Sequence, residues 1–294
     1  MSSASPAPSP KLAFLDRDHS ILAFNLRVLD WARRPDVPLL ERLRYLCIVS
    51  SNLDEFFEVR AAAHITAVTD GDTKGAYTQA SFEALMASAQ GLVARQYQLY
   101  NEALAPALAA EGLRIVSHGQ RTAEQRRWVQ EYFLREVRPL LVPVGLDPAH
   151  PFPMVANKSL NFIVRLKGSD AFGRSNEIAI VRVPRALPRV IRIPARAAGK
   201  ESIFVLLSSV IRAHLADLFP GRELGEFSQF RVTRHSELAV DEEDVSNLRT
   251  ALRQGLTQRN YGQSVRLEVS ASCTRFLSDF LQAQFSLPAQ AVFR

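Results

Sequence analysis

The sequence has few of the features that stabilise secreted or membrane-spanning proteins. It contains two cysteines, Cys47 and Cys273, which lie far apart in apolar helical patterns. A disulfide framework is therefore not expected, and both are predicted to be small buried hydrophobic residues. No apolar run reaches the ~18 residues needed to cross a bilayer. The first ten residues lack the charged and apolar regions of a secretory signal. We expect residues 1–14 to be a disordered tail and the protein to be cytoplasmic, with membrane association left open.

Sequence motifs for catalysis are also missing. There is no Gly-rich phosphate loop of the P-loop or dinucleotide type, and no serine lies in a nucleophile elbow. The six histidines have no metal-ligand spacing, so neither a metal site nor a catalytic residue is predicted. The four acids at 241–244 begin a predicted helix, where they would compensate its dipole. His150 lies in a rigid proline-rich turn, where a structural role is favoured over acid–base catalysis.

The charge balance is basic and depends almost entirely on arginine. The formal net charge is +6, and only five of the 36 basic residues are lysine. Arginine presents a planar fork that suits phosphate oxygens, so a polyanionic partner is compatible with this composition. The arginines are scattered, however, rather than gathered in a block with interleaved aromatic residues. Nucleic acid is therefore not predicted as a partner.

The length of 294 residues suggests two domains, and the pattern of apolar residues changes between them. Apolar spacings of three and four predict helices over 19–32, 38–49, 52–68 and 78–110. From Pro139 onward, β-rich runs at 140–144, 160–166, 177–183, 229–234 and 264–269 alternate with helices predicted over 122–137, 204–219, 241–257 and 274–285. We predict an all-α helical N-terminal domain over 15–120 followed by an α+β domain over 121–294.

The run 50–60 has the sharpest change from polar to apolar residues in the chain. Ser51 and Asn52 are good N-cap residues, and each has an acid three positions later, at Asp54 and Glu55. One interpretation is an ordinary helix start at Asn52. The other is a side-chain amide held at the helix mouth to meet a ligand, because an amide donates and accepts at once and suits a nucleobase edge.

Six stretches carry a family resemblance. They are 22–29, 37–43, 50–60, 147–160, 230–234 and 265–269. Taken together, and in this order, they resemble the front of the long bacterial polyphosphate kinases, which pass the terminal phosphate of ATP onto inorganic polyphosphate. One departure is the run 18–21, Asp-His-Ser-Ile, where the family usually has Glu-Leu-Ser-Trp. This change affects local packing of the first helix and leaves the resemblance intact.

The resemblance implies that the helical domain is followed by the family's head domain, which contributes to dimerisation, so a homo-oligomer is expected. It also implies that Asn52 contacts the base of ATP. As an N-cap, Asn52 would bond its oxygen to the backbone and leave its NH₂ group for a purine nitrogen. The phosphorylated histidine, the phosphate-binding arginines and the Mg²⁺ ligands belong to the family's two C-terminal domains, which residues 1–294 do not include.

The function that the resemblance implies is reversible transfer of the terminal phosphate of ATP to inorganic polyphosphate, with ATP, ADP and polyphosphate as partners. Residues 1–294 would supply the adenine-contacting side of the ATP site and the head domain, and alone would be inactive. The alternative is a non-catalytic binding or assembly module of the same fold, which binds polyphosphate or a full-length enzyme.

Overall fold

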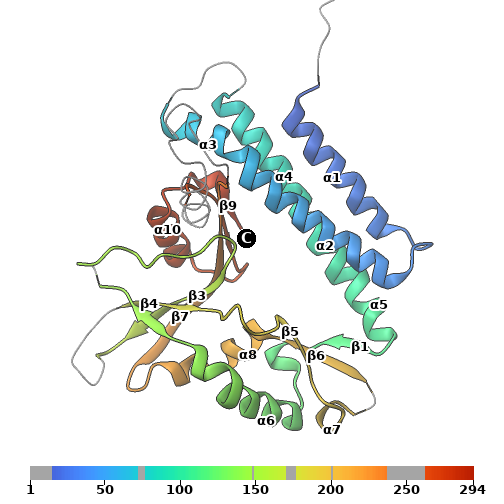
Figure 1. Cartoon of the computed structure of the whole chain (residues 1–294), viewed down its shortest axis with the longest axis vertical. Helices are drawn as coiled ribbons and strands as arrows, with labels where there is room; N and C mark the ends of the chain where they lie inside the picture. Colours follow the sequence, from blue (N-terminus) through green and yellow to red (C-terminus); the bar gives the residue numbers. More distant parts are fainter. Residues whose placement is uncertain (1–14, 72–76, 148, 170–176, 200, 237–261) are drawn as a thin grey trace, which may run out of the picture.

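The computed structural model describes residues 15–71, 77–147, 149–169, 177–199, 201–236 and 262–294. Figure 1 shows a layer of long helices, coloured blue to green, packed beside a head of sheets and shorter helices. This order of a helical part followed by a mixed part confirms the predicted fold class. None of the helices in the described ranges is both long and apolar enough to cross a membrane.

The helical part begins with well-capped helices. It contains α1 (Arg17–Arg33), α2 (Leu39–Phe56), α3 (Ala62–Thr69), α4 (Gln79–Leu99) and α5 (Ala105–Ala110). The Asp16 side chain caps α1 by accepting from the backbone N–H of His19 at 2.8 Å. Thr78 and Ser81 form a reciprocal capping box at the start of α4. A π-helical turn, η2 (Tyr100–Leu104), joins α4 to α5 directly, so the predicted helix over 78–110 is confirmed.

The predicted helix start at Asn52 is wrong. Helix α2 runs through this position, and a π-helical turn, η1 (Phe57–Ala61), carries it into α3 without a loop. Residues 39–50 are already helical, so the N–H groups that an N-cap would satisfy have carbonyl partners within the helix. Extending an existing helix costs far less than nucleating a new one. The Asn52 side chain bonds to a neighbouring helix instead.

The described residues of the head form two sheets. The smaller has the order β1-β6-β5, formed by β1 (Leu113–Ile115), β6 (Ser202–Leu206) and β5 (Val190–Arg192). The larger has the order β2-β4-β3-β7-β8-β9, formed by β2 (Pro143–Gly145), β4 (Ile178–Arg182), β3 (Leu160–Lys167), β7 (Glu223–Arg234), β8 (Ser264–Val269) and β9 (Val292–Phe293). Neighbours in the larger sheet are antiparallel except for β8 and β9, which are parallel.

Short helices cover these sheets. They are α6 (Ala123–Tyr132), α7 (Ala195–Ala198), α8 (Leu207–Ala213) and α10 (Arg275–Gln284). The helix predicted over 204–219 is wrong at its start, because 202–206 forms β6 and the α-helix ends at 213. Ile203 and Val205 alternate toward the core in β6, and a short apolar run of this kind does not distinguish strand from helix by periodicity alone. The tail at 1–14 and the helix predicted over 241–257 lie outside the described residues.

The two cysteines differ in burial. Cys273 is buried, as predicted, whereas Cys47 is exposed, so the prediction for Cys47 is wrong. Helix α2 buries Leu46 and Val49, together with later residues at helical spacing. Cys47 is one residue past Leu46, which is about 100° around a helix, and therefore lies off that face.

The hydrophobic core of the helical part includes residues from the head. Val265 of β8 and Phe293 of β9 belong to the same buried cluster as the side chains of α1, α2 and α4. The Phe293 ring meets the Phe57 ring edge to face, with centroids 5.4 Å apart. The helical part and the head therefore share one apolar contact around Phe57.

We expect Phe293→Ala to lower the free energy of unfolding by about 3–5 kcal/mol, as is typical when a buried phenylalanine leaves a cavity. Phe293 is 4% exposed, whereas Phe276 on α10 is 43% exposed and serves as the matched control. Urea denaturation of both variants measures the difference. An equal, small effect of the two substitutions would contradict the shared core.

Candidate nucleotide site and its ion-pair network

Asn52 lies on α2, five residues before the helix gives way to the π-helical turn. Its Nδ2 donates to Oδ1 of Asn25 on α1 at 3.1 Å. Asn25, which is 2% exposed, in turn donates from Nδ2 to the carbonyl of Val49 at 3.0 Å. This is the reverse of the pattern expected for an N-cap, since the Asn52 NH₂ group is engaged. The Asn52 Oδ1 accepts no hydrogen bond from the described residues and remains available to a donor.

A second amide fixes α2 against α4. Gln96 is 7% exposed, and its Nε2 donates to the carbonyl of Leu46 at 2.9 Å and to Oγ of Ser50 at 2.6 Å. Together with the Asn25 contacts, these bonds join α2 to helices on two sides. The polar side chains in the middle of α2 therefore form hydrogen bonds with neighbouring helices. These bonds pair donors and acceptors that burial would otherwise leave without partners.

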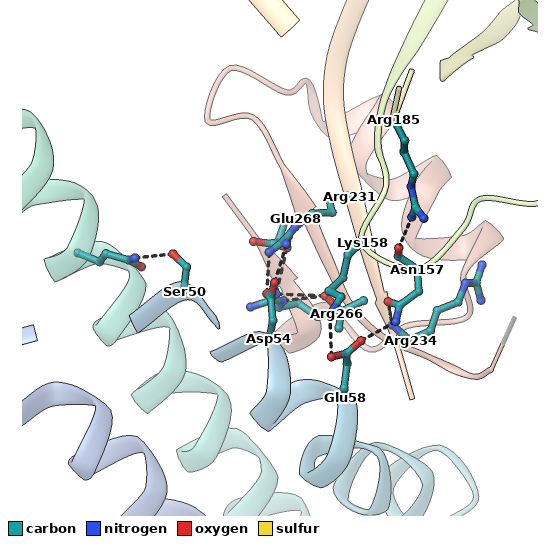
Figure 2. A network of polar contacts seen from close by, with 12 residues as sticks. Ser50, Asp54, Glu58, Asn157, Lys158, Arg185, Arg231, Arg234, Arg266 and Glu268 are labelled. Carbon is teal, nitrogen blue, oxygen red and sulfur yellow. Dashed lines mark hydrogen bonds and ion pairs between the residues drawn. The ribbon is translucent and has the colours of Figure 1, made fainter. Parts of the chain in front are cut away.

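Asp54, half a turn beyond Asn52, joins α2 to the head. Nη1 and Nη2 of Arg231 on β7 donate to its two carboxylate oxygens, each at 2.9 Å. Arg266 on β8 donates from Nη2 to the same carboxylate. Glu268 accepts from Nε of Arg231 at 2.6 Å and lies 3.2 Å from Nη2 of Arg266. We call these four residues the Asp54 network (Figure 2).

The Asp54 network neutralises an arginine that has almost no access to water. Arg266 is 1% exposed, and its guanidinium lies over the Phe57 ring at 4.5 Å from the centroid. Nε and Nη2 of Arg266 also donate to Oγ1 of Thr233, at 3.3 and 3.1 Å. A buried cation without a partner is strongly unfavourable, so Arg266 requires a carboxylate on α2.

The electrostatics follow from this burial. Burial by itself would raise the pKa of Asp54, but the hydrogen bonds and charges of Arg231 and Arg266 outweigh it and hold the pKa below its usual value. Burial would lower the pKa of Arg231, but the charges and hydrogen bonds of Glu268 and Asp54 raise it instead. Asp54 and Arg231 are therefore charged at neutral pH.

A second acid, Glu58, contacts the head one helical turn after Asp54. Its Oε1 accepts from Nδ2 of Asn157 at 2.6 Å, and its Oε2 accepts from Nζ of Lys158 at 2.9 Å. Asn157 Oδ1 accepts from the backbone N–H of Arg234 at 2.9 Å, so Asn157 joins Glu58 to β7 (Figure 2). Lys158 has a φ of 56°, a left-handed conformation that few residues other than glycine adopt.

A groove of about 670 Å³ lies beside this region, between α4 and the ends of β8 and β9. Its lining includes Tyr97, Asn101, Ser270, Phe293 and Arg294. Asn52 is not among the lining residues, so the predicted ATP-contacting residue and this groove are distinct features of the described chain.

Within the described residues, no three histidine, cysteine or acidic side chains gather closely enough to hold a metal ion. His150 is exposed, and its Nδ1 lies 3.2 Å from Oδ2 of Asp147 in the turn where the sequence placed it. Hydrogen bonds from the Ala149 backbone and from His150 lower the pKa of Asp147. The acids at 241–244 lie outside the described residues.

Sequence reasoning did not identify the Asp54 network. It treated Asp54 and Glu55 as capping partners, whereas Asp54 and Glu58 have the i,i+4 spacing that places two acids on one helix face. Arg231 and Glu268 lie directly opposite each other on paired strands. That cross-strand charge pair was the available signal, but the pairing of β7 with β8 is not evident from the sequence.

Two family models match nearly the whole chain. The model described as "Polyphosphate kinase N-terminal domain" matches residues 14–116, and "Polyphosphate kinase middle domain" matches residues 124–294. The chain belongs to the polyphosphate kinase family. The suspected family is therefore confirmed, and the predicted division at 120/121 falls between the two matched ranges, although no finding tests that boundary itself.

Curated relatives agree with this family. The polyphosphate kinase of Neisseria meningitidis serogroup B is 48% identical over 284 residues, which cover 95% of this chain and 42% of the relative. That of Burkholderia cenocepacia is 49% identical over 267 residues, covering 90% and 39%. The chain thus spans about two-fifths of the length of these polyphosphate kinases. The crystal structure of polyphosphate kinase from Porphyromonas gingivalis has the same fold, with a TM-score of 0.77 and 23% identity over 97% of this chain and 39% of that one.

We expect Asp54→Asn to lower the free energy of unfolding at neutral pH by about 3 kcal/mol, because Arg266 loses a buried counter-charge. The folded-state pKa of Asp54 is lowered, so its contribution is complete above the unfolded pKa near ~4 and is lost as the pH falls through the folded pKa. Urea titrations of wild type and variant from about pH 7 to about pH 2 should therefore converge in acid.

The matched control is Asp279→Asn, which removes an exposed carboxylate that pairs with Arg275 on α10. Its side chain is 59% exposed, and pairs of this kind contribute little. An equal loss in both variants, or a loss for Asp54→Asn that does not change with pH, would contradict the role assigned to the Asp54 network.

Proposed function

We propose that these residues form the N-terminal and head portion of a polyphosphate kinase that reversibly transfers the terminal phosphate of ATP to inorganic polyphosphate. In this proposal Asn52 contacts the adenine base, and the head contributes to a homo-oligomer. The parent enzyme works in the cytoplasm, with membrane association left open. The family membership and the similarity to polyphosphate kinases over most of this chain support the assignment.

The observation that carries the role of Asn52 is its setting. Helix α2 is joined to α1 and α4 by buried amides, and to the head by Asp54 and Glu58. A base-contacting residue needs such rigid support, because a small displacement of a binding group weakens the interaction it makes. Asn52 is only partly buried, and its free Oδ1 suits the exocyclic amine of adenine.

Transfer of a phosphoryl group needs cations and a nucleophile around the moving phosphorus atom. By resemblance to the family, the phosphorylated histidine, its arginines and the Mg²⁺ ligands belong to domains beyond the two that match here. No cluster suited to a metal ion occurs in the described residues, so no step through Mg²⁺ is assigned to this chain. ATP and ADP would contact these residues only through the base.

We expect the purified 294-residue chain, incubated with ATP, Mg²⁺ and a polyphosphate primer, to produce no elongated polyphosphate. The physical reason is that a base contact alone provides no stabilisation of the transferred group. The measurement is the incorporation of labelled phosphate from ATP into long-chain polyphosphate. Sustained elongation by this chain would contradict the proposal that these residues supply only the base-contacting side of the ATP site.

The role of Asn52 is tested in a chain extended to the full length of the relatives. We expect Asn52→Ala to raise KM for ATP about fivefold with kcat nearly unchanged, because one hydrogen bond to the base contributes about 1 kcal/mol to substrate and transition state alike. The ratio of kcat/KM for ATP over that for GTP should also fall.

The control for this experiment is Gln98→Ala, which removes an exposed amide from α4. Thermal unfolding should first show that Asn52→Ala leaves the fold intact, since the variant also loses the bond to Asn25. An unchanged KM and an unchanged preference for ATP in a folded Asn52→Ala variant would reject the base contact.

A further inference from the structure

Arg121 is a buried cation without an acidic partner. It is 2% exposed, and Nη2 donates to Oγ of Ser209 on α8 at 2.6 Å. Its Nε is buried and has no hydrogen-bond partner in the described structure. Arg266, the other arginine buried to this degree, meets the carboxylates of Asp54 and Glu268. Arg121 therefore keeps its charge in a setting where the described chain supplies no opposite charge.

Other basic side chains lie near Arg121. His118 lies three residues before it in a short 3-10 turn, η3 (His118–Gln120). Arg126 on α6 donates from Nε to the Arg121 carbonyl at 3.1 Å and, like Arg212 on α8, is exposed. Among the described residues no carboxylate forms an ion pair with any of these three arginines. We call His118, Arg121, Arg126 and Arg212 the Arg121 cluster.

The basic groups of the Arg121 cluster act on one another. Burial lowers the pKa of His118, and the positive charges of Arg121, Arg212, Arg126 and His214 lower it further. The first turn of α6 carries an acid, Glu124, which forms no ion pair with another described residue, and Asp217 Oδ2 lies 2.9 Å from Nδ1 of His214. The N-terminus of α6, capped by Thr122, adds the positive end of a helix dipole next to Arg121.

We propose that the Arg121 cluster binds inorganic polyphosphate on the head, at a site separate from Asn52. An anion there would supply the charge that Arg121 lacks, and guanidinium forks match phosphate oxygens. Arg126 is on α6 and Arg212 is on α8, so a chain of phosphates would be contacted from two helices. Figure 1 places α6 at the lower end of the molecule, away from α1 and α3. The choice of polyphosphate as the ligand rests on the function proposed above.

The cluster is less suited to nucleic acid. Single strands are usually held by aromatic side chains that stack on bases between the phosphate contacts. The Arg212 guanidinium lies 5.6 Å from the centroid of the Phe227 ring, and that ring is partly buried in the core. A linear chain of phosphates without bases needs only the cations.

The test follows the ring protons of His118 by NMR in the 294-residue chain, with tripolyphosphate, long-chain polyphosphate and orthophosphate as separate ligands. A bound polyanion offsets the neighbouring cations, so the pKa of His118 should rise toward its ordinary value. The double variant Arg126→Gln/Arg212→Gln should weaken polyphosphate binding at least tenfold and abolish that rise. Both side chains are exposed, so the variant is expected to fold.

The matched control is Arg127→Gln paired with Arg196→Gln, which removes two exposed arginines outside the cluster and changes the net charge equally. An equal weakening by the control, or an unchanged His118 pKa with saturating polyphosphate, would overturn the site. Equal binding of a single-stranded DNA with the same number of phosphates would overturn the choice of polyphosphate. The Asn52→Ala variant should bind polyphosphate as tightly as the wild type. The test of the Arg121 cluster is therefore independent of the test of the adenine contact.

Discussion

The burial of the Arg266 guanidinium is the constraint on which the arrangement of the two parts depends. It lies in a shared apolar contact formed by Phe57 and Phe293, where water cannot solvate it. The carboxylate of Asp54 on α2 and that of Glu268 on β8 supply the compensating charge. An interface built only from apolar contacts would tolerate sliding, whereas the bidentate ion pair of Arg231 with Asp54 restricts direction as well as distance. Helix α2 is thereby held in one register on the head.

This constraint places Asn52 between two polar systems that differ in kind. Toward α1 and α4 the neighbours are neutral amides, Asn25 and Gln96, which satisfy backbone and side-chain groups inside the helical layer. Toward the head the neighbours are charged, beginning with Asp54. One face of the segment 50–58 therefore packs against α1 and α4, and the other face contacts the head. Its polar residues resemble a helix start in the sequence, but in the structure they lie inside a continuous helix and contact neighbouring elements.

The arginine excess is divided between these tasks and the surface. Arg231 and Arg266 are paired with acids inside the molecule and contribute to its assembly. The arginines of the Arg121 cluster form no ion pair with an acid among the described residues, which is why the cluster is proposed to bind an anion. Net charge alone could not separate the two groups, because an ion-paired arginine and an unpaired one count equally in composition.

The sequence by itself determined the order of a helical part and an α+β part, the long helix at 78–110 and the strands at 160–166 and 264–269, because these depend on local periodicity and caps. It also singled out the run 50–60 and Asn52. Only the tertiary structure decided that α2 passes through Asn52, that 202–206 is a strand and that Cys47 is exposed. It also decided that Asp54 meets Arg231 and Arg266, 177 and 212 residues later. Partners so distant in sequence are set by strand pairing and shared burial, which no local pattern encodes.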